Sequence, residues 1–458
     1  MILPFHSLSG EPFLYDSFTN RILAVSETLH GELTRASGLV SGIMDPVVRM
    51  ACIQAGLRDG EPGIDSPEDL RQSMELSGLG LSKLVLGLTH QCNLRCRYCI
   101  YGGSVPGERT HEQAAMSLET ARRVLEQLRA RSQVPRSVIF YGGEPLLNWD
   151  VLRFFVETFD LPGGAERFAM ATNGLLLDDP DRLSFLVAHR VLLNVSLDGP
   201  GHDRMRVTPS GEGTLARLLK VLGTIRQAHP DYYSESVGFV ATVTPFTRLL
   251  ETAEFFNSDE LFAGKVIVSS WVFDPAGALG SKEELEGEKS RQNAEWELLR
   301  RSYPRNYGRG LPFDDGLHLQ KMLAIDQRPI PPPSTIPLNA CCYPGLNELF
   351  IDAGGRVTAC ERTEHFQLGE VGEELCRPER AEEMASRYHE FVSRHCPPCF
   401  AHRLCNKCFA QVGRGRLDEE TFLSLCEDQR RAVRRSLELY VTIKSERPDA
   451  FEKEKTVF

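Results

Sequence analysis

The cysteines of this 458-residue chain are concentrated in two short stretches. Cys92, Cys96 and Cys99 lie within eight positions of one another, and no further cysteine follows until Cys341. Nine of the 13 cysteines then fall between residues 341 and 426. An odd number of clustered cysteines is typical of metal ligation or catalysis rather than of a disulfide framework. The clustering therefore predicts two metal-binding modules with a cysteine-free segment between them.

The composition excludes several classes of protein. With 41% hydrophobic and 25% charged residues, the chain has a globular composition, and its length suits roughly two to four domains. The 52 basic and 63 acidic residues give a net charge of −11, which argues against duplex DNA as a partner because phosphate contacts need clustered basic charge. There is no apolar run of about 18 residues, and the first residues lack a signal-peptide pattern. We therefore expect a cytoplasmic protein with no nucleic-acid or membrane partner.

The cysteine-free segment and its surroundings alternate strand-like and helix-like patterns. Predicted strands cover residues 84–89, 137–141, 167–172, 191–197, 237–243 and 266–271. Helical patterns separate them, such as residues 118–130 with an apolar face of Ala121, Val124, Leu125 and Leu128. Repeated strand–helix units predict an α/β fold with a parallel sheet, either open or closed into a full or partial barrel. Functional side chains in such folds lie at the carboxyl ends of the strands.

Five regions can be distinguished along the chain. Residues 1–82 predict a small α+β unit with strands at 13–16 and 21–25 and helices that begin at Ser26, Asp45 and Ser66. Residues 83–300 form the strand–helix core. Residues 301–335 bridge to the cysteine-rich module and end in a proline-rich, extended connector. The cysteine-rich module covers residues 336–430, and a C-terminal helical region covers 431–458, with an amphipathic helix expected around 429–444.

The first cysteine cluster directly follows the first strand of the core. A structural zinc ion would need a fourth ligand, and Cys-x3-Cys-x2-Cys is not a usual zinc spacing. A 4Fe–4S cluster held by three cysteines keeps one iron open for another ligand. The position and the spacing therefore favour a catalytic iron–sulfur cluster over three ordinary buried cysteines.

The segment Cys-Asn-Leu-Arg-Cys-Arg-Tyr-Cys closely resembles the signature of the radical S-adenosylmethionine (SAM) enzymes. The resemblance implies that Cys92, Cys96 and Cys99 bind a 4Fe–4S cluster whose free iron takes the amino and carboxylate groups of SAM. It implies that the reduced cluster cleaves SAM to methionine and a 5′-deoxyadenosyl radical, which abstracts a hydrogen atom. It also implies a partial (β/α)6 TIM-like barrel over residues 83–300, with Tyr98 near the adenine.

Polar and glycine-rich motifs follow the next strands. Gly142, Gly143 and Glu144 match the family motif that holds the SAM amino group, and paired glycines let a backbone approach a ligand closely. A plain strand-to-helix turn is the alternative. Asn173, in Ala-Thr-Asn-Gly, is also similar to the family, and a helix-capping turn is its alternative.

The fourth strand ends in Ser-Leu-Asp-Gly-Pro, which contains Ser196 and Asp198. Hydroxyl, carboxylate and guanidinium groups suit a ribose and a methionyl carboxylate. The resemblance implies that Ser196, Asp198 and Arg206 contact these parts of SAM, with Arg217 as a further candidate for the carboxylate. The interval before the following His-Asp pair is shorter than in the family.

The second cluster resembles the SPASM extension of radical SAM enzymes, which carries two auxiliary 4Fe–4S clusters. The resemblance implies one set of ligands formed by Cys342, Cys360 and Cys408, with Cys341 as a substitute or fourth ligand. It implies a second set formed by Cys396, Cys399, Cys405 and Cys426. Two zinc sites are the alternative, and the final Cys-x2-Cys step is one residue shorter than in the family. Cys52 and Cys376 have no place in the pattern.

Glu361, directly after Cys360, stands where sulfatase-maturing relatives carry an acidic base, although a solvated glutamate is the simpler interpretation. The predicted cofactors are thus three 4Fe–4S clusters and SAM. The N-terminal unit resembles the leader-recognition element of enzymes that mature ribosomal peptides, although a cap on the barrel is an alternative. We therefore expect a peptide-modifying enzyme that cross-links side chains, with a thioether favoured.

The expected partners are a precursor peptide with its leader and a flavodoxin- or ferredoxin-type reductant. A sulfatase maturase that makes formylglycine and a non-catalytic, zinc-bound peptide scaffold are the alternatives.

Overall fold

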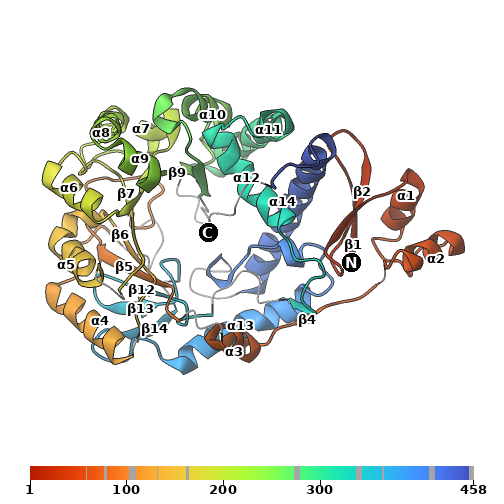
Figure 1. The fold of residues 1–458 in the computed structure, drawn as a ribbon, viewed down its shortest axis with the longest axis horizontal. Helices are drawn as coiled ribbons and strands as arrows, with labels where there is room; N and C mark the ends of the chain where they lie inside the picture. The colour runs from red at the N-terminus through yellow and green to blue at the C-terminus, as the bar shows by residue number, and fades with distance from the viewer. Residues whose placement is uncertain are drawn as a thin grey trace. The chain divides into compact units, whose positions relative to one another are not determined.

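The computed structural model describes residues 1–57, 59–76, 80–102, 110–131, 133–160, 164–272, 279–336, 343–363, 366–411 and 418–452. These residues belong to two compact units (Figure 1). The first unit combines Met1–Leu76, His318–Tyr343 and Glu382–Phe458, and the second combines Ser77–Leu317 and Pro344–Ala381. Each unit therefore contains part of the cysteine-rich region.

A parallel sheet forms the centre of the second unit. Its six main strands are β5 (Lys83–Thr89), β6 (Ser137–Gly142), β7 (Arg167–Thr172), β8 (Leu192–Ser196), β9 (Val237–Val243) and β10 (Ile267–Trp271). They neighbour one another in chain order, and every pair is parallel. The six strands predicted from the sequence are confirmed. The sheet and its helices form the partial barrel expected of the family.

Three further strands extend this sheet beyond β5. They are β12 (Glu348–Ile351), β13 (Arg356–Thr358) and β14 (Gln367–Glu370). β12 is parallel to β5, whereas β13 and β14 continue as an antiparallel meander. Residues 344–381 of the cysteine-rich region thus belong to the same sheet as the core.

Helices cover the outer face of the curved sheet (Figure 1). Those of this unit are α4 (Leu118–Ala130), α5 (Trp149–Phe159), α6 (Pro180–Ala188), α7 (His202–Met205), α8 (Leu215–Ala228), α9 (Pro230–Ser236), α10 (Leu249–Ser258) and α11 (Lys282–Asn306), with short 3-10 turns η1 (Pro145–Asn148), η2 (Gly199–Gly201) and η3 (Glu260–Phe262). The apolar face predicted for residues 118–130 is confirmed, because all four of its residues are buried. α12 (Pro312–Asp326) follows α11.

The first unit begins with an antiparallel sheet and three helices. The strands are β1 (Ile2–His6), β2 (Pro12–Asp16) and β3 (Arg21–Ala24), and the helices are α1 (Glu27–Arg35), α2 (Pro46–Gln54) and α3 (Pro67–Leu76). Two predicted caps are confirmed, because Ser26 accepts from the Leu29 amide and Asp45 from that of Val47. Sequence reasoning missed β1, in which Pro4 is tolerated because β1 is an edge strand.

The C-terminal part of the first unit is mainly helical. It contains β11 (Thr335–Ile336), paired in parallel with β4 (Gly63–Ile64), then α13 (Pro378–His395), η4 (His402–Leu404), η5 (Phe409–Gln411) and α14 (Glu419–Glu446). The helix predicted around 429–444 is longer than expected, because Asp418 caps its start through the Thr421 amide. None of the described helices is long and apolar enough to cross a membrane.

Candidate active site and cysteine-lined pocket

The first cysteine cluster lies on the loop that follows β5. Each of its three sulfurs accepts an N–H: Cys92 from the Leu94 amide at 3.4 Å, Cys99 from the Tyr101 amide at 3.4 Å, and Cys96 from Arg206 Nη1 at 3.9 Å. Hydrogen bonds of this kind are what tune sulfur ligands in iron–sulfur sites. Each of the three sulfurs thus already has an N–H donor, as sulfur ligands of a cluster commonly have.

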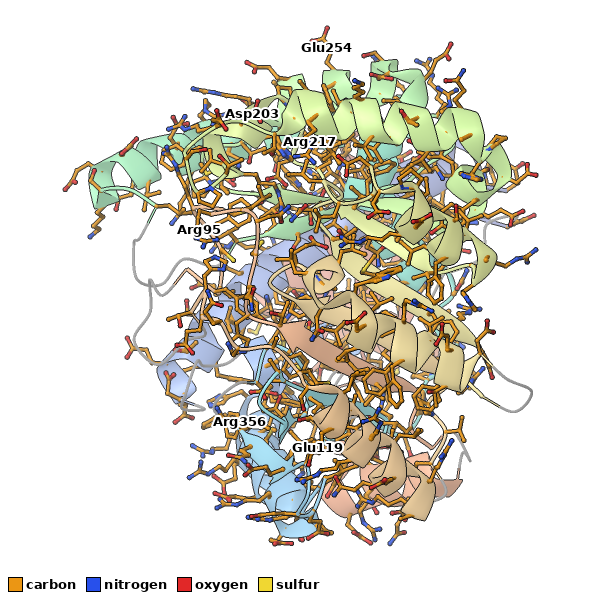
Figure 2. The ribbon with its side chains drawn as sticks, turned by 90° about the vertical axis from the view of Figure 1, so that its left-hand side faces the viewer. Arg95, Glu119, Asp203, Arg217, Glu254 and Arg356 are labelled. Atoms are coloured by element: carbon orange, nitrogen blue, oxygen red, sulfur yellow. The ribbon has the colours of Figure 1, made fainter. Side chains whose placement is uncertain are left out.

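The backbone of this loop is fixed from across the second unit. The Arg95 amide donates to the Val207 carbonyl at 2.7 Å, and the Arg97 amide donates to the Met205 carbonyl at 2.9 Å. Figure 2 shows Arg95 and Asp203, from the loop and from α7, toward the same edge of the unit. The loop is thus held in place by the segment that follows β8.

The thiols themselves are poor acids in this setting. Burial raises the pKa of Cys92 and of Cys96 to about 11, and it also raises the pKa of Cys99. A metal centre would reverse this preference, because binding to a cationic cluster holds the sulfurs as thiolates and releases their protons. Three partly buried sulfurs with amide and guanidinium donors fit a three-cysteine 4Fe–4S cluster.

The glycine pair after β6 has a clear steric reason. A Cβ on Gly142 would lie 2.4 Å from the Thr89 carbonyl oxygen, and one on Gly143 would lie 2.1 Å from that of Gln91. The Gly143 amide also donates to the Thr89 carbonyl at 2.7 Å. These glycines therefore let the end of β6 pack against the residues just before Cys92. Their predicted contact with the SAM amino group stays a prediction.

Glu144 is completely buried and connects two strand ends. Its carboxylate accepts from the Thr172 hydroxyl at 2.8 Å and from the Asn173 amide at 2.9 Å, and burial raises its pKa to about 7. It also accepts from the Leu146 amide at 3.3 Å, as in a plain strand-to-helix turn. Asn173 in turn donates to Asn93 Oδ1 at 2.7 Å. The ends of β6 and β7 are thus tied to the cysteine loop.

Asp198 is the centre of a buried polar network after β8. Its Oδ2 accepts from Tyr98 Oη at 2.6 Å and from Arg206 Nε at 2.9 Å, while its Oδ1 accepts from the Thr242 amide at 2.9 Å. The Arg206 guanidinium lies 5.3 Å from the centre of the Tyr98 ring. Burial opposes the charge on Arg206, but Asp198 raises the pKa of Arg206 above its ordinary value.

The structure thus brings Tyr98, Asp198 and Arg206 together beside Cys96. The predicted SAM contacts of these three side chains remain untested. Sequence reasoning missed Thr242, whose hydroxyl oxygen accepts a hydrogen bond from Arg206 Nη2 at 3.2 Å. Its position at the carboxyl end of the predicted strand 237–243 was the available signal.

Two other predicted SAM contacts differ in their surroundings. Ser196 is half-buried at the carboxyl end of β8, on the same side of the sheet as the network. Arg217, in contrast, is largely exposed and forms an ion pair with Asp178 at 2.7 Å. Arg217 also donates to the Leu175 carbonyl at 3.1 Å.

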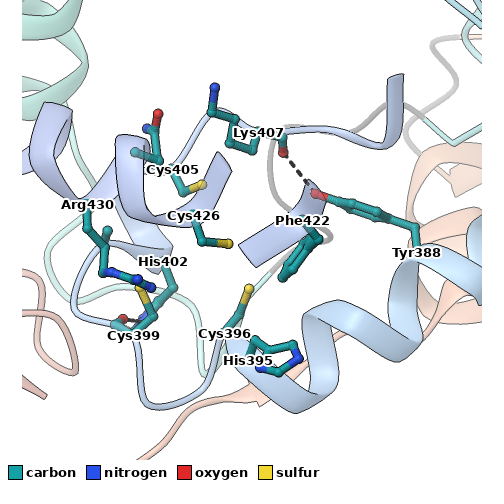
Figure 3. A pocket seen from close by; sticks show the side chains of 12 residues that line it. Tyr388, His395, Cys396, Cys399, His402, Cys405, Lys407, Phe422, Cys426 and Arg430 are labelled. Atoms are coloured by element: carbon teal, nitrogen blue, oxygen red, sulfur yellow. Dashed lines mark hydrogen bonds between the residues drawn. The ribbon is translucent and has the colours of Figure 1, made fainter. Parts of the chain in front are cut away.

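Four cysteines of the first unit line one pocket. They are Cys396, Cys399, Cys405 and Cys426, and Figure 3 shows them around a shared space. Burial, with a smaller contribution from the neighbouring sulfurs of Cys426 and Cys399, raises the pKa of Cys405 to about 11. Four sulfurs around one space fit a 4Fe–4S cluster with complete cysteine ligation, and they would also fit zinc.

Two cationic side chains lie around this pocket. Lys407 and Arg430 line it together with the cysteines (Figure 3), whereas burial lowers the pKa of His402, which also lines it, to about 4. Cationic side chains lower the cost of several thiolates in one place. The surroundings are therefore suited to a cluster with a net negative charge.

The other predicted auxiliary ligands are not brought together among the described residues. Cys341 and Cys342 lie outside these residues, whereas Cys360 belongs to the second unit and Cys408 to the first. Burial, with a smaller contribution from the neighbouring Glu361 carboxylate, raises the pKa of Cys360 to about 12. This ligand set therefore remains a prediction.

The remaining candidates have simpler explanations. Glu361 pairs with its neighbour Arg362 at 3.5 Å, as a partly solvated glutamate would. Cys52 lies in the apolar core of the first unit, and Cys376 is buried in the second. Both cysteines are ordinary buried thiols, as expected.

Comparison with known families identifies the second unit. Residues 86–250 match the model of the radical SAM superfamily. Residues 86–250 of this chain therefore form a radical SAM domain. The domain covers β5 to β9, and all three cysteines of the first cluster lie within it.

Known relatives of this radical SAM protein match it only in part. A GTP 3′,8-cyclase from Aeromonas hydrophila subsp. hydrophila is 38% identical over 138 residues, which are 30% of this chain and 39% of the relative. A cysteine-type anaerobic sulfatase-maturating enzyme from Clostridium novyi is 24% identical over 158 residues, 33% of this chain and 42% of the relative. The chain thus spans about two fifths of the length of these relatives.

The structural match to a solved protein covers more of the chain than the sequence matches do. The solved structure of native anSMEcpe with bound AdoMet and Cp18Cys peptide has a TM-score of 0.58 and 17% identity. The match covers 80% of this chain and 99% of that one. At this identity the likeness establishes the fold.

Proposed function

We propose that this protein cleaves SAM reductively and modifies side chains of a ribosomal precursor peptide. The observation that carries the proposal is the set of three cysteine sulfurs, each with an N–H donor, beside the buried Asp198–Arg206 pair. When bound, the cluster and SAM would supply a 5′-deoxyadenosyl radical that removes a hydrogen atom from the substrate. Cys92, Cys96 and Cys99 would hold the cluster.

The surrounding residues would position this cofactor set. Arg206 contacts both Cys96 Sγ and Asp198, so that it couples the cluster loop to the end of β8. Tyr98 donates to the same carboxylate and stands one residue before Cys99. Gly142 and Gly143 would offer backbone carbonyls to the SAM amino group, and Glu144, Asn173 and Ser196 would complete the site.

The cysteine-lined pocket would hold an auxiliary 4Fe–4S cluster. Its four ligands would be Cys396, Cys399, Cys405 and Cys426, and the further cluster would use Cys342, Cys360 and Cys408, with Cys341 beside them. Zinc is the alternative occupant of both sites. The iron content discriminates, because three 4Fe–4S clusters require about twelve irons per chain.

Two features of the first unit support a peptide substrate. Among the described residues β3 pairs only with β2, which leaves its outer edge available to an extended strand. On α2, Val47, Met50 and Ile53 are 78%, 54% and 53% exposed. An exposed apolar stripe of this kind is typical of a protein or peptide contact. The unit would thus bind the leader while the core of the peptide reaches the radical site.

A thioether is the product that we favour. A flavodoxin- or ferredoxin-type protein would supply the electron that cleaves SAM, and the 5′-deoxyadenosyl radical would take one hydrogen atom from the attacked carbon. Bond formation with the thiol would then release one proton and one electron, and an auxiliary cluster would accept the electron. The setting would be the cytoplasm, where the thiols stay reduced. Glu361 would act as a catalytic base only if its pair with Arg362 opened.

Formylglycine formation in a sulfatase is the second candidate. The fold match with anSMEcpe over 80% of the chain favours it. The match to the GTP 3′,8-cyclase is 138 residues long. This is shorter than residues 1–82 and 336–430 together, so at least part of these two regions has no counterpart in the match. A non-catalytic zinc scaffold is disfavoured by the radical SAM domain.

The decisive experiment is anaerobic co-expression with each short peptide encoded beside the gene, followed by mass spectrometry. We expect a peptide that loses two hydrogens per cross-link and formation of 5′-deoxyadenosine, both absent in Cys96→Ala. A cysteine-containing sulfatase peptide and GTP serve as competing substrates. Conversion of either one, without any change in the encoded peptides, would overturn the proposed substrate class.

A further inference from the structure

We propose that His6, Glu27 and His30 form a binding site for a divalent transition metal, with zinc as the preferred ion. His6 is the last residue of β1, Glu27 is the first residue of α1, and His30 stands three residues later. All three belong to the first unit and contain no sulfur. The site would therefore share no ligand with the cysteine clusters.

The donor atoms of this cluster already lie close together. One ligand atom from each of the three residues lies within 4.8 Å of the others. His6 Nε2 lies 3.8 Å from Glu27 Oε2, and the two imidazole rings are 4.1 Å apart. Tetrahedral zinc with bonds of about 2.0–2.1 Å holds its donors roughly 3.3 Å apart. Since the side chains of His6 and Glu27 are 44% and 72% exposed, small rotations would close this difference.

His30 provides an independent observation that points to a ligand. The residue is only 9% exposed, and its Nε2 is buried without a hydrogen-bond partner. The Phe5 backbone, which raises the pKa of His30 slightly, also lies near the ring. Metal-bound histidines bind the ion through one ring nitrogen that is free of other hydrogen bonds. A metal would satisfy the nitrogen that is otherwise left unpaired.

The local fold explains why these side chains meet. Ser26 caps α1 through the Leu29 amide at 3.3 Å, which starts the helix at Glu27. The spacing of three residues then places Glu27 and His30 on one side of the helix. Glu-x-x-His pairs are used as metal ligands on helices of other folds.

The charges around the cluster are mixed. Burial lowers the pKa of His30, which keeps its imidazole neutral and able to bind a metal at physiological pH. Arg434, whose Nη1 donates to the Pro4 carbonyl at 3.3 Å, contributes a positive charge that opposes a cation. The Glu27 carboxylate offsets it. Two imidazoles and one carboxylate suit zinc, with one position left for water or a fourth ligand.

The test uses the full-length protein with its clusters in place, equilibrated anaerobically with low-micromolar free Zn²⁺. Zinc and iron are measured by elemental analysis, and the zinc ligands by X-ray absorption. We expect one bound zinc with only nitrogen and oxygen ligands at about 2.0–2.1 Å. The double variant His6→Gln/Glu27→Gln, which changes two exposed side chains, should lose this zinc and keep its iron.

A matched control is available in the second unit. His189 and Asp160 also form a histidine–carboxylate pair, but they have no third ligand among the described residues. His189→Gln/Asp160→Asn should bind as much zinc as the wild type. The proposal is overturned if no zinc binds, if the zinc has sulfur ligands at about 2.3 Å, or if the first double variant retains it.

Discussion

At the scale of single residues, Asp198 is the centre of the buried polar network beside the first cysteine cluster. It is 5% exposed and accepts from Tyr98, Arg206 and the Thr242 amide. Each donor comes from a different segment of the radical SAM domain. Removing the carboxylate would leave the buried Arg206 charge without its counterion, which is costly because the surroundings cannot solvate it.

Asp198→Asn should therefore lower the free energy of unfolding by about 3–5 kcal/mol. The matched control is Asp178→Asn, because Asp178 pairs with Arg217 at 2.7 Å where both side chains are about half exposed. The control should cost no more than about 1 kcal/mol. Denaturant unfolding of the second unit measures both changes. Equal effects of the two substitutions would contradict the role of the buried pair.

His202 gives the second unit a defined pH dependence. It is 1% exposed, and burial lowers its pKa to about 4. Because the folded-state pKa lies below the unfolded value of about 6.5, stability is present above pH 6.5 and is lost as the pH falls toward 4. Between about pH 7.5 and pH 6.0 this loss should be about 0.8 kcal/mol. In His202→Gln, the decrease in the free energy of unfolding between about pH 7.5 and pH 6.0 should be smaller by this amount. An equal decrease in the variant and the wild type would show that His202 does not cause the pH dependence.

At the scale of elements, the packing of β6 against the cysteine loop links the fold to the cofactor. Gly142 and Gly143 approach the Thr89 and Gln91 carbonyls so closely that no side chain fits. The register of the β5–β6 pair also shifts there, between Gly87 and Thr89. The loop that holds the three sulfurs therefore depends on the absence of a Cβ one strand away.

Gly143→Ala should displace the loop and reduce the iron content by about four atoms per chain, one 4Fe–4S cluster. The secondary structure should be unchanged. Gly223→Ala on α8 is the matched control, since a Cβ there would meet nothing within 4 Å. Iron and sulfide analysis with circular dichroism measures both variants. Full iron retention in Gly143→Ala would show that the close approach is dispensable.

The exposed stripe on α2 leads to a prediction about the partner. Val47→Glu should weaken binding of the precursor peptide by about tenfold, because a charge would interrupt the apolar contact. Gln54→Glu adds the same charge at another exposed position of the helix and should have little effect. Fluorescence anisotropy of a labelled peptide measures affinity. Neither substitution should change SAM cleavage without peptide, and equal affinities for both variants would exclude the stripe as the contact.

At the scale of the whole molecule, the cysteine-rich region contributes to both compact units. Residues 344–381 extend the sheet of the second unit through β12, whereas residues 396–426 build the four-cysteine pocket of the first. The proposed auxiliary clusters are therefore not confined to a separate C-terminal domain.

The sequence alone determined the local features of this protein. Strand and helix periodicity, the caps at Ser26 and Asp45, and the spacing of Cys92, Cys96 and Cys99 each depend on a few neighbouring residues, so that they could be recognised without a structure. The parallel arrangement of the six strands was expected from the same patterns, because repeated strand–helix units build parallel sheets, whereas their order in the sheet came from the structure.

Only the tertiary structure decided which distant side chains meet. Arg206 contacts Cys96 across 110 positions, and the Thr242 amide reaches Asp198 across 44. The cluster of His6, Glu27 and His30 exists because β1 packs beside α1. The sequence did not predict β1, because a proline such as Pro4 argues against a strand. Such pairings depend on how strand ends and helices pack in space, a property that no local pattern contains.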